Sequence, residues 1–246
     1  MPPKVLFILG GGPRIGHSVA RKFLQEGYKV AIGRRNLQEA AESTGLDGVV
    51  PVYLDVTKPE SVEAAFREVE SKLGVPNVVV YNAAAFTMPP DANDPFQVPT
   101  ASFEQDLAVN ASSAYAGLLH ATRGFLSSKA KSTEDNDALP YVYIATGNVT
   151  PFQPNPVAVT LGSGKATLAY LISVGAQAYK AAGYRFYFAS QVTATGGPVP
   201  YPDVSGEAHG DLFWKVVNRE MGLNSWDLRF VVNSEGGVSD REERND

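Results

Sequence analysis

The chain contains no cysteine, which excludes disulfide bonds and thiolate metal sites. Only three histidines are present, His17, His120 and His209, and their spacing forms no metal-ligand motif, so we expect no bound metal. The sequence also lacks an apolar stretch of about 18 residues and a secretory signal, so we expect no transmembrane helix and no export. Because the net charge is −5 without a basic block, nucleic acid and membrane are poor partner candidates. We expect a cytoplasmic protein.

The alternation of short β-rich runs with longer amphipathic runs is typical of α/β proteins, in which helices cover both faces of a parallel sheet. At 246 residues and 44% hydrophobic content, one domain spanning residues 1–246 can bury a full core. We therefore predict a doubly wound parallel sheet of about seven strands. The predicted strands are Val5–Leu9, Lys29–Ile32, Val49–Leu54, Val78–Tyr81, Tyr141–Ala145, Arg185–Ala189 and Arg229–Val232. The predicted helices are His17–Glu26, Val62–Leu73, Phe103–Phe125 and Lys165–Ala182.

Four segments rich in polar residues, proline or glycine interrupt this rhythm. Phe86–Ser102 is predicted to be a loop over the carboxyl edge of the sheet, and 127–138 a solvated surface excursion. The segment 193–210 indicates either a lid over a substrate or a plain connection. The charged tail Ser239–Asp246 is expected to fray. The large apolar residues Phe213, Trp214 and Trp226 are assigned to the core or to a subunit interface.

A glycine cluster stands between the first predicted strand and the helix after it, with Gly10, Gly12 and Gly16 in a G-x-G-x-x-x-G spacing. Glycines in such a turn let the backbone approach a pyrophosphate, and the helix N-terminus supplies unpaired N–H groups. The context favours a Rossmann-like dinucleotide site that includes Arg14 and Ile15, although an ordinary tight turn would also use glycines. Arg14 either reaches a phosphate of the cofactor or caps the pocket.

The second predicted strand ends in Arg34 and Arg35 and is not followed by an acidic residue. In dinucleotide folds this strand end faces the adenosine ribose, where an acid favours NAD and arginine accommodates the 2′-phosphate of NADP. Paired guanidinium groups suit a phosphate dianion through charge-assisted hydrogen bonds. The pair therefore favours NADP(H), with an exposed basic turn as the alternative interpretation.

Four further elements follow the glycine turn in order along the chain: Leu54-Asp55-Val56-Thr57, Asn82-Ala83-Ala84, Val109-Asn110 and Gly164-Lys165. In order and approximate spacing, over almost the whole chain, these elements resemble those of the short-chain dehydrogenase/reductase family. The resemblance implies that Asp55 and Val56 contact the adenine ring and that the Asn82 element lines the cofactor. It also implies that Lys165 binds the nicotinamide ribose, that Asn110 holds a water in a proton relay, and that the protein is a homodimer or homotetramer.

The sequence departs from the family pattern at the expected reaction centre. The family's catalytic Tyr falls on Leu161, which has no proton to donate, and its Ser falls near Asn148. Asn148 or Thr146 could polarise a substrate oxygen, although either could instead satisfy backbone groups of a turn. The family's Pro-Gly element beside the nicotinamide is also missing; backbone contacts around Val192 to the carboxamide, and from Thr193 to a phosphate, remain as candidates.

No replacement for the missing acid stands out in the sequence. Ser163 lies on a different helix face from Leu161, whereas Lys165 shares its face and could donate a proton through water. Tyr143 and Tyr187 lie on strands whose side chains alternate in direction, and core packing is the favoured role of both. Loss of a positioned general acid typically costs about 10²- to 10⁴-fold in rate.

The sequence therefore predicts an NADP(H)-dependent oxidoreductase that acts on a small, fairly apolar carbonyl, imine or enone with a non-standard active site. The candidate catalytic residues are Lys165, Asn110, Asn148 and Thr146. The competing hypothesis is a non-redox protein on the same scaffold, either an isomerase, cyclase or lyase or a cofactor-sensing regulator, because fold alone does not fix function.

Overall fold

Eight strands form one sheet in the order β3-β2-β1-β4-β5-β6-β7-β8. The computed structural model describes residues 2–37, 47–129, 139–221, 225–233 and 236–241. Neighbouring strands are parallel except β7 and β8, which are antiparallel. The strands are β1 Val5–Leu9, β2 Lys29–Arg34, β3 Val49–Tyr53, β4 Val78–Tyr81, β5 Val142–Thr146, β6 Arg185–Gln191, β7 Asp227–Val232 and β8 Val238–Asp240. The predicted doubly wound α/β fold is confirmed, with one additional antiparallel edge strand.

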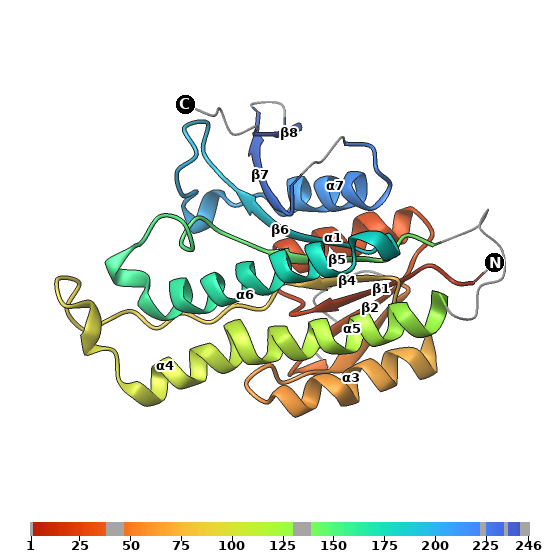
Figure 1. Cartoon of the computed structure of the whole chain (residues 1–246), viewed down its shortest axis with the longest axis horizontal. Coiled ribbons are helices and arrows are strands. Elements are labelled where there is room, and N and C mark those ends of the chain that lie inside the picture. Colours follow the sequence, from red (N-terminus) through yellow and green to blue (C-terminus); the bar gives the residue numbers. More distant parts are fainter. Residues whose placement is uncertain (1, 38–46, 130–138, 222–224, 234–235, 242–246) are drawn as a thin grey trace.

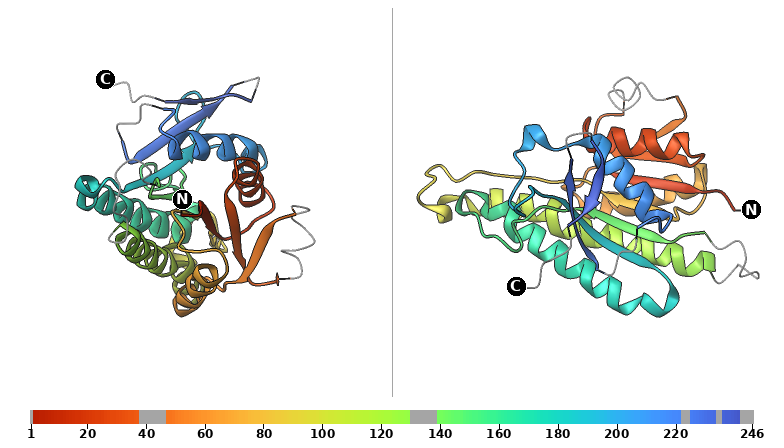
Figure 2. Two further views of the ribbon diagram at one scale, coloured as in Figure 1. Left: turned by 90° about the vertical axis from the view of Figure 1, so that its right-hand side faces the viewer. Right: turned by 90° about the horizontal axis from the view of Figure 1, so that it is seen from above.

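Helices cover both faces of this sheet (Figures 1 and 2). One layer holds α3 Pro59–Lys72, α4 Thr100–Leu107, α5 Ser113–Lys129 and α6 Val159–Ala178; the other holds α1 Ile15–Gln25 and α7 Gly206–Val217. Because side chains alternate along a strand, β1 supplies both cores: Phe7 packs in the first layer and Ile8 in the second. Every residue of β1 is buried, as expected of a strand covered on both faces.

The predicted elements are present, with shifted ends. Helix α6 begins at Val159, six residues before the predicted start, so it includes Leu161 as well as Lys165. The predicted helix Phe103–Phe125 is longer and is interrupted by a π-helical turn at Ala108–Ser112, which lies between α4 and α5. A π turn carries an extra residue per turn and often marks a functional position. Here the turn contains Asn110.

The bounds of three predicted surface segments are corrected by the structure. Within the predicted excursion, residues 127–129 are the last turn of α5, while 130–138 lie outside the described residues. Within the predicted loop Phe86–Ser102, the last three residues already belong to α4, because the helix begins at Thr100. Of the predicted frayed tail, Ser239 and Asp240 pair with β7, while 242–246 lie outside the described part of the chain.

Helix α7 is the largest element that the sequence did not predict, and it includes residues 206–210 of the predicted lid. Its glycines obscure the helical pattern, but they have a packing reason: a Cβ at Gly206 would lie 2.4 Å from the carbonyl oxygen of Arg14 on the neighbouring turn. The helix buries Phe213 fully, and Trp214 packs edge-to-face against Phe23. These aromatic residues therefore belong to the core between α1 and α7.

The composition of helix α6 corrects the expectation that the sequence lacks an apolar stretch of about 18 residues. An 18-residue window within Pro156–Ala178 has a mean hydropathy of 1.4, so by length and composition alone this helix could cross a membrane. The core helix of a globular protein meets the same criterion. Here α6 packs against β6, and Leu168 and Ile172 are fully buried. Contact with the sheet accounts for the apolar residues on the buried face of the helix.

Candidate functional site

A pocket of about 860 Å³ lies at the carboxyl ends of β1, β2, β4, β5 and β6. The strand order reverses between β1 and β4, and such switch points are where doubly wound sheets bind ligands. Most predicted site residues line this pocket: Gly10, Gly12, Arg14, Ile15, Arg34, Arg35, Val56, Asn82, Ala83, Ala84, Thr146, Asn148 and Lys165. Five do not: Gly16, Asp55, Asn110, Val192 and Thr193.

The glycine turn at one side of the pocket needs its glycines for different reasons. Gly10 has φ +98°, and a Cβ there would lie 2.6 Å from the backbone nitrogen of Ala83. A Cβ at Gly16 would lie 3.0 Å from the Cα of Gly11, so this residue lets α1 approach the turn rather than lining the pocket. Gly12 differs, because a Cβ there would have no neighbour closer than 3.9 Å. The surface above Gly12 is therefore open to a ligand.

Backbone N–H groups at the N-terminus of α1 lie beside the same open surface. Arg14, the N-cap residue, makes no side-chain cap, and no hydrogen bond within the described residues engages the backbone N–H of Arg14, Ile15 or Gly16. The Nδ2 of Asn82 donates to the carbonyl oxygen of Gly10 at 2.8 Å and holds the turn in place. An open glycine surface beside free helix N–H groups fits a pyrophosphate.

Basic residues without acidic ones line the pocket at the end of β2. Arg34 is half-buried at the end of β2, and Arg35 is exposed beside it. Among the described lining residues none is Asp or Glu. Asp55 lies outside the lining; its Oδ1 accepts hydrogen bonds from the N–H and hydroxyl of Thr57, at 3.1 and 2.7 Å, which lower the pKa of the carboxyl. The Asp55 carboxylate thus stabilises its own loop.

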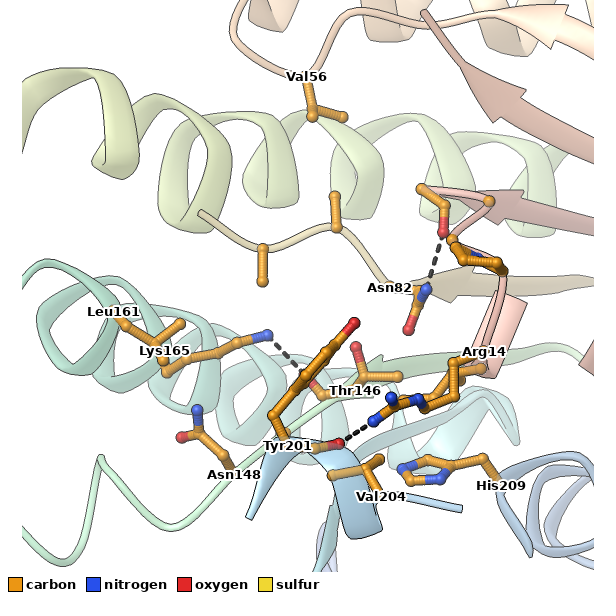
Figure 3. A pocket seen from close by; sticks show the side chains of 18 of the residues that line it. Arg14, Val56, Asn82, Thr146, Asn148, Leu161, Lys165, Tyr201, Val204 and His209 are labelled. Carbon is orange, nitrogen blue, oxygen red and sulfur yellow. Dashed lines mark hydrogen bonds between the residues drawn. The ribbon is translucent and has the colours of Figure 1, made fainter. Parts of the chain in front are cut away.

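Lys165 lies at the opposite side of the pocket, on α6 (Figure 3). Its side chain is 3% exposed, and its Nζ donates a hydrogen bond to the carbonyl oxygen of Thr146 at 2.7 Å. Burial lowers the pKa of the amine to about 8, because the charged form loses its hydration. Leu161, one helical turn earlier, also lines the pocket, so no proton donor occupies that position.

Two polar residues, one at the end of β5 and one just after it, line the pocket together with Lys165. The hydroxyl of Thr146 donates to the carbonyl oxygen of Tyr81 at 3.2 Å, so its proton is engaged within the sheet. Asn148 Oδ1 accepts from the N–H and hydroxyl of Thr150, at 3.0 and 2.6 Å, which leaves its amide nitrogen as the group able to donate to a ligand. Of the two, Asn148 is the better candidate for orienting a substrate oxygen.

Asn110 is fully buried and reaches the pocket only indirectly. Its Oδ1 accepts from the N–H of Ala85 at 2.9 Å, and its Nδ2 donates to the carbonyl oxygen of the same residue at 2.8 Å. This pair of bonds fixes the segment that carries Asn82 and Ala83. Gly164 of α6 lies against Asn110, so the π turn, the β4 loop and the lysine helix are packed at one point.

The Gly164 contact predicts a strong difference between two glycines of one helix. A Cβ at Gly164 would lie 2.2 Å from the Cβ of Asn110, whereas a Cβ at Gly162 would have no neighbour closer than 3.6 Å. We expect Gly164→Ala to lower the free energy of unfolding by about 1–3 kcal/mol or more through overpacking. Gly162→Ala, the matched control, should raise it by about 0.5–1 kcal/mol. Urea unfolding of both variants measures this, and equal effects would contradict the close contact.

Two residues after β6 for which the sequence predicts cofactor contacts have contacts within the protein. Val192 is buried and forms an isolated β-bridge with Pro198. The hydroxyl of Thr193 accepts from the N–H of Gly197 at 2.9 Å and so closes the turn between them. Neither residue lines the pocket, because this segment folds back on itself.

The two tyrosines considered as replacement acids are also packed inside the protein. The hydroxyl of Tyr143 donates to the carbonyl oxygen of Ala114 at 3.3 Å, and complete burial raises its pKa well above the usual value. Tyr187 is 8% exposed and packs in the second core layer. Core packing is confirmed for both residues, and neither lines the pocket.

The lining also includes residues that no motif singled out: Gln191, Pro198, Val199, Tyr201, Val204 and His209. His209 is 2% exposed, and its Nδ1 donates to the carbonyl oxygen of Ser205 at 2.6 Å. Burial lowers its pKa to about 4, so the ring is neutral at neutral pH. The Tyr201 side chain is drawn between those of Lys165 and Arg14, with its ring directed inward (Figure 3). Within the described residues no group of three or more His, Cys, Asp or Glu could hold a metal ion.

Comparison with known proteins agrees with this geometry. The family model described as Enoyl-(Acyl carrier protein) reductase matches residues 13–134. The Short chain dehydrogenase/reductase dmxR12 of Cryptosporiopsis sp. (strain 8999) is 30% identical over 252 residues, which cover 97% of this chain and 96% of the relative. The 3-oxoacyl-[acyl-carrier-protein] reductase of Bos taurus is 42% identical over 83 residues, covering 33% and 35%.

Solved structures share the fold over nearly the whole chain. A metagenomic short-chain oxidoreductase in complex with NADP superposes with a TM-score of 0.74 at 15% identity, covering 94% of this chain and 98% of that one. The 3-ketoacyl-(acyl-carrier-protein) reductase from Brucella melitensis complexed with NADH gives a TM-score of 0.76 at 19% identity, covering 94% and 97%. These structures share the fold, and the relative that is 30% identical over 97% of this chain shows that the chain belongs to the short-chain dehydrogenase/reductase family.

Proposed function

We propose that the protein is an NADP(H)-dependent oxidoreductase that reduces a small, fairly apolar carbonyl, imine or enone. One observation carries the proposal: a single pocket joins the open glycine turn, two arginines and a buried lysine at the switch point of the sheet. Known members of the family named above are reductases by their printed names, and one of the similar structures holds NADP and another NADH.

The residues present fit a dinucleotide along the length of the pocket. The free N–H groups of Arg14 and Ile15 would hold the pyrophosphate above Gly12. Val56 and Ala83 would line the adenosine and central parts, and Lys165 would bind the nicotinamide ribose as the family resemblance implies. When bound, the nicotinamide supplies a hydride. The chain's own residues then have to orient the acceptor and keep water away from it.

The choice of NADP(H) rests on charge at the adenosine end. The guanidinium groups of Arg34 and Arg35 line the pocket there, and no acidic residue of the described lining opposes a phosphate. An acidic residue at this position would instead favour the unphosphorylated ribose. The arginine pair therefore supports selection of the 2′-phosphate.

The proposed substrate class rests on the apolar side chains of the pocket. Leu161, Val149, Val199 and Val204 are among its lining residues, with Asn148 as a hydrogen-bond donor. An apolar wall with few polar groups suits a small apolar acceptor. Among the relatives, the Peroxisomal 2,4-dienoyl-CoA reductase of Danio rerio, 32% identical over 87 residues, is named for a conjugated substrate, which supports including enones.

The proposal is tested by binding followed by turnover. We expect NADPH to bind, measured by titration calorimetry, and its absorbance to fall when it is mixed with the protein and a panel of apolar aldehydes, ketones, cyclic imines and enones. Binding without turnover of any acceptor would favour the non-redox alternative. Absence of binding by both NADPH and NADH would refute the assignment of the pocket.

Cofactor preference gives a separate prediction. We expect Arg34→Ala combined with Arg35→Ala to weaken NADPH binding roughly 10- to 100-fold, because hydrogen bonds to charged groups contribute about 1.5–3 kcal/mol. NADH affinity should not change, since NADH lacks the 2′-phosphate. Arg67→Ala, on the exposed face of α3, is the control for loss of a positive charge. Equal losses for both nucleotides would show that the pair does not read the phosphate.

A further inference from the structure

Tyr201 is the only tyrosine among the described residues that line the pocket. It begins a short 3₁₀ turn, Tyr201–Asp203, between β6 and α7. In Figure 3 its ring extends from this turn into the pocket, with the hydroxyl on the side of Lys165 and Asn82. A phenol from a different segment therefore enters the pocket that Leu161 also lines.

Arg14 contacts this tyrosine, and Gln191 binds the segment that follows it. The Arg14 guanidinium lies 4.3 Å from the centre of the Tyr201 ring and also donates a hydrogen bond to the Tyr201 carbonyl oxygen. On the other side, Gln191 Oε1 accepts from the N–H of Ser205 at 2.8 Å, and its Nε2 donates to the carbonyl oxygen of Asp203 at 3.4 Å. Arg14 thus joins the glycine turn to the segment that carries the ring, through cation–π and hydrogen-bond contacts.

The hydroxyl of Tyr201 differs from those of the core tyrosines. The hydroxyls of Tyr81, Tyr143 and Tyr184 each donate to a backbone carbonyl oxygen. No described residue accepts from the hydroxyl of Tyr201, and the residue is 74% exposed. Its proton is therefore available to a ligand, and water can restore the proton after it leaves.

We propose that Tyr201 is the proton donor to the substrate oxygen, an inference that rests on the proposed reductase function. As a hydride reaches the carbonyl carbon, the C=O electron pair moves onto oxygen. The O–H bond of Tyr201 breaks, and its proton bonds to that oxygen to give the alcohol. The phenolate then takes a proton from solvent. Arg14 acts as the positioning residue, because it fixes both the ring and the backbone of Tyr201.

The Tyr201→Phe variant tests this step, because it removes one oxygen and keeps the ring on which Arg14 stacks. For a carbonyl that the wild type reduces, we expect kcat to fall roughly 10²- to 10⁴-fold. The Kd for NADPH and the KM should stay close to wild type. Tyr170→Phe is the matched control, since Tyr170 is 70% exposed on α6 and does not line the pocket; it should leave all constants unchanged.

A second substrate separates proton donation from positioning. Reduction of the N-methyl-3,4-dihydroisoquinolinium cation takes up a hydride and no proton, so Tyr201→Phe should reduce it at the wild-type rate. Equal losses on the carbonyl and the iminium cation would show that the hydroxyl only orients ligands and would overturn the inference. Full carbonyl activity in Tyr201→Phe would overturn it as well and would leave the reductase function standing. A wild type that binds NADPH but reduces neither substrate would refute the reductase function and this inference with it.

If the iminium cation does not enter the wild-type pocket, the pH dependence of kcat makes the same distinction. Besides Tyr201, the ionisable groups that line this pocket are Arg14, Arg34 and Arg35, Lys165 from α6 and His209 from α7. A decline of carbonyl reduction at alkaline pH that is lost in Tyr201→Phe supports the phenol as donor. A decline near pH 8 that persists in the variant assigns the proton to Lys165, whose pKa is about 8, and overturns the inference.

Discussion

Replacing Lys165 with methionine is expected to abolish most of the reductase activity. The ammonium is buried at the pocket wall, where it would donate to the ribose of the dinucleotide. Two hydrogen bonds from a charged donor contribute about 1.5–3 kcal/mol each, so kcat/KM should fall roughly 10²- to 10⁴-fold. Initial rates of NADPH oxidation measure this. Exposed Lys180→Met is the control, and unchanged activity in Lys165→Met would remove the lysine from the site.

The same substitution should change how stability depends on pH. Burial lowers the pKa of Lys165 from 10.5 to about 8, so between these values the unfolded chain holds a proton that the folded protein has lost. Wild-type stability therefore rises with pH across this window, relative to Lys165→Met, by about 3 kcal/mol. Urea unfolding of both proteins at pH 7 and pH 10 measures the difference. Parallel pH dependences would show that this lysine keeps its ordinary proton affinity when folded.

Substitution of two glycines in the glycine turn should separate the effect on protein stability from the effect on NADPH binding. Gly12→Val places its side chain in open space, so the free energy of unfolding should change by no more than about 0.5 kcal/mol. The same side chain occupies the space above the turn, and overpacking of about 3 kcal/mol would weaken NADPH binding by roughly 10²-fold. The measurements are urea unfolding and calorimetric titration.

Gly10→Ala is the contrasting variant. Its φ of +98° and the 2.6 Å approach to the Ala83 nitrogen predict a loss of stability of about 1–3 kcal/mol or more before any ligand is added. If Gly12→Val binds NADPH normally, the phosphate does not lie over the turn. If Gly10→Ala is as stable as wild type, the turn is looser than its contacts indicate.

Local patterns in the sequence predicted most of the fold and one side of the site. The apolar run at β1, the glycines after it and the spacing of Leu161 from Lys165 each lie within a few residues of chain. A parallel α/β pattern brings the carboxyl ends of successive strands to one edge, so Asn82 and Thr146 could be placed near the glycine turn without a structure.

Contacts that a motif does not reveal engage other predicted site residues. Asp55 has the right position in its motif, yet its carboxylate binds Thr57. Asn110 satisfies Ala85 with both ends of its amide, and Thr193 closes a turn. A short sequence element specifies which polar group is present, but the nearest available donor or acceptor decides where that group points.

By itself, then, the sequence determined the strand and helix periodicities, the glycine turn and the position of the lysine, because each depends on residues close together in the chain. Only the tertiary structure decided that α7 packs on α1 and that Arg14 meets Tyr201, 187 residues away. Contacts at that separation are set by how whole layers pack, and no local pattern of polar and apolar residues encodes them.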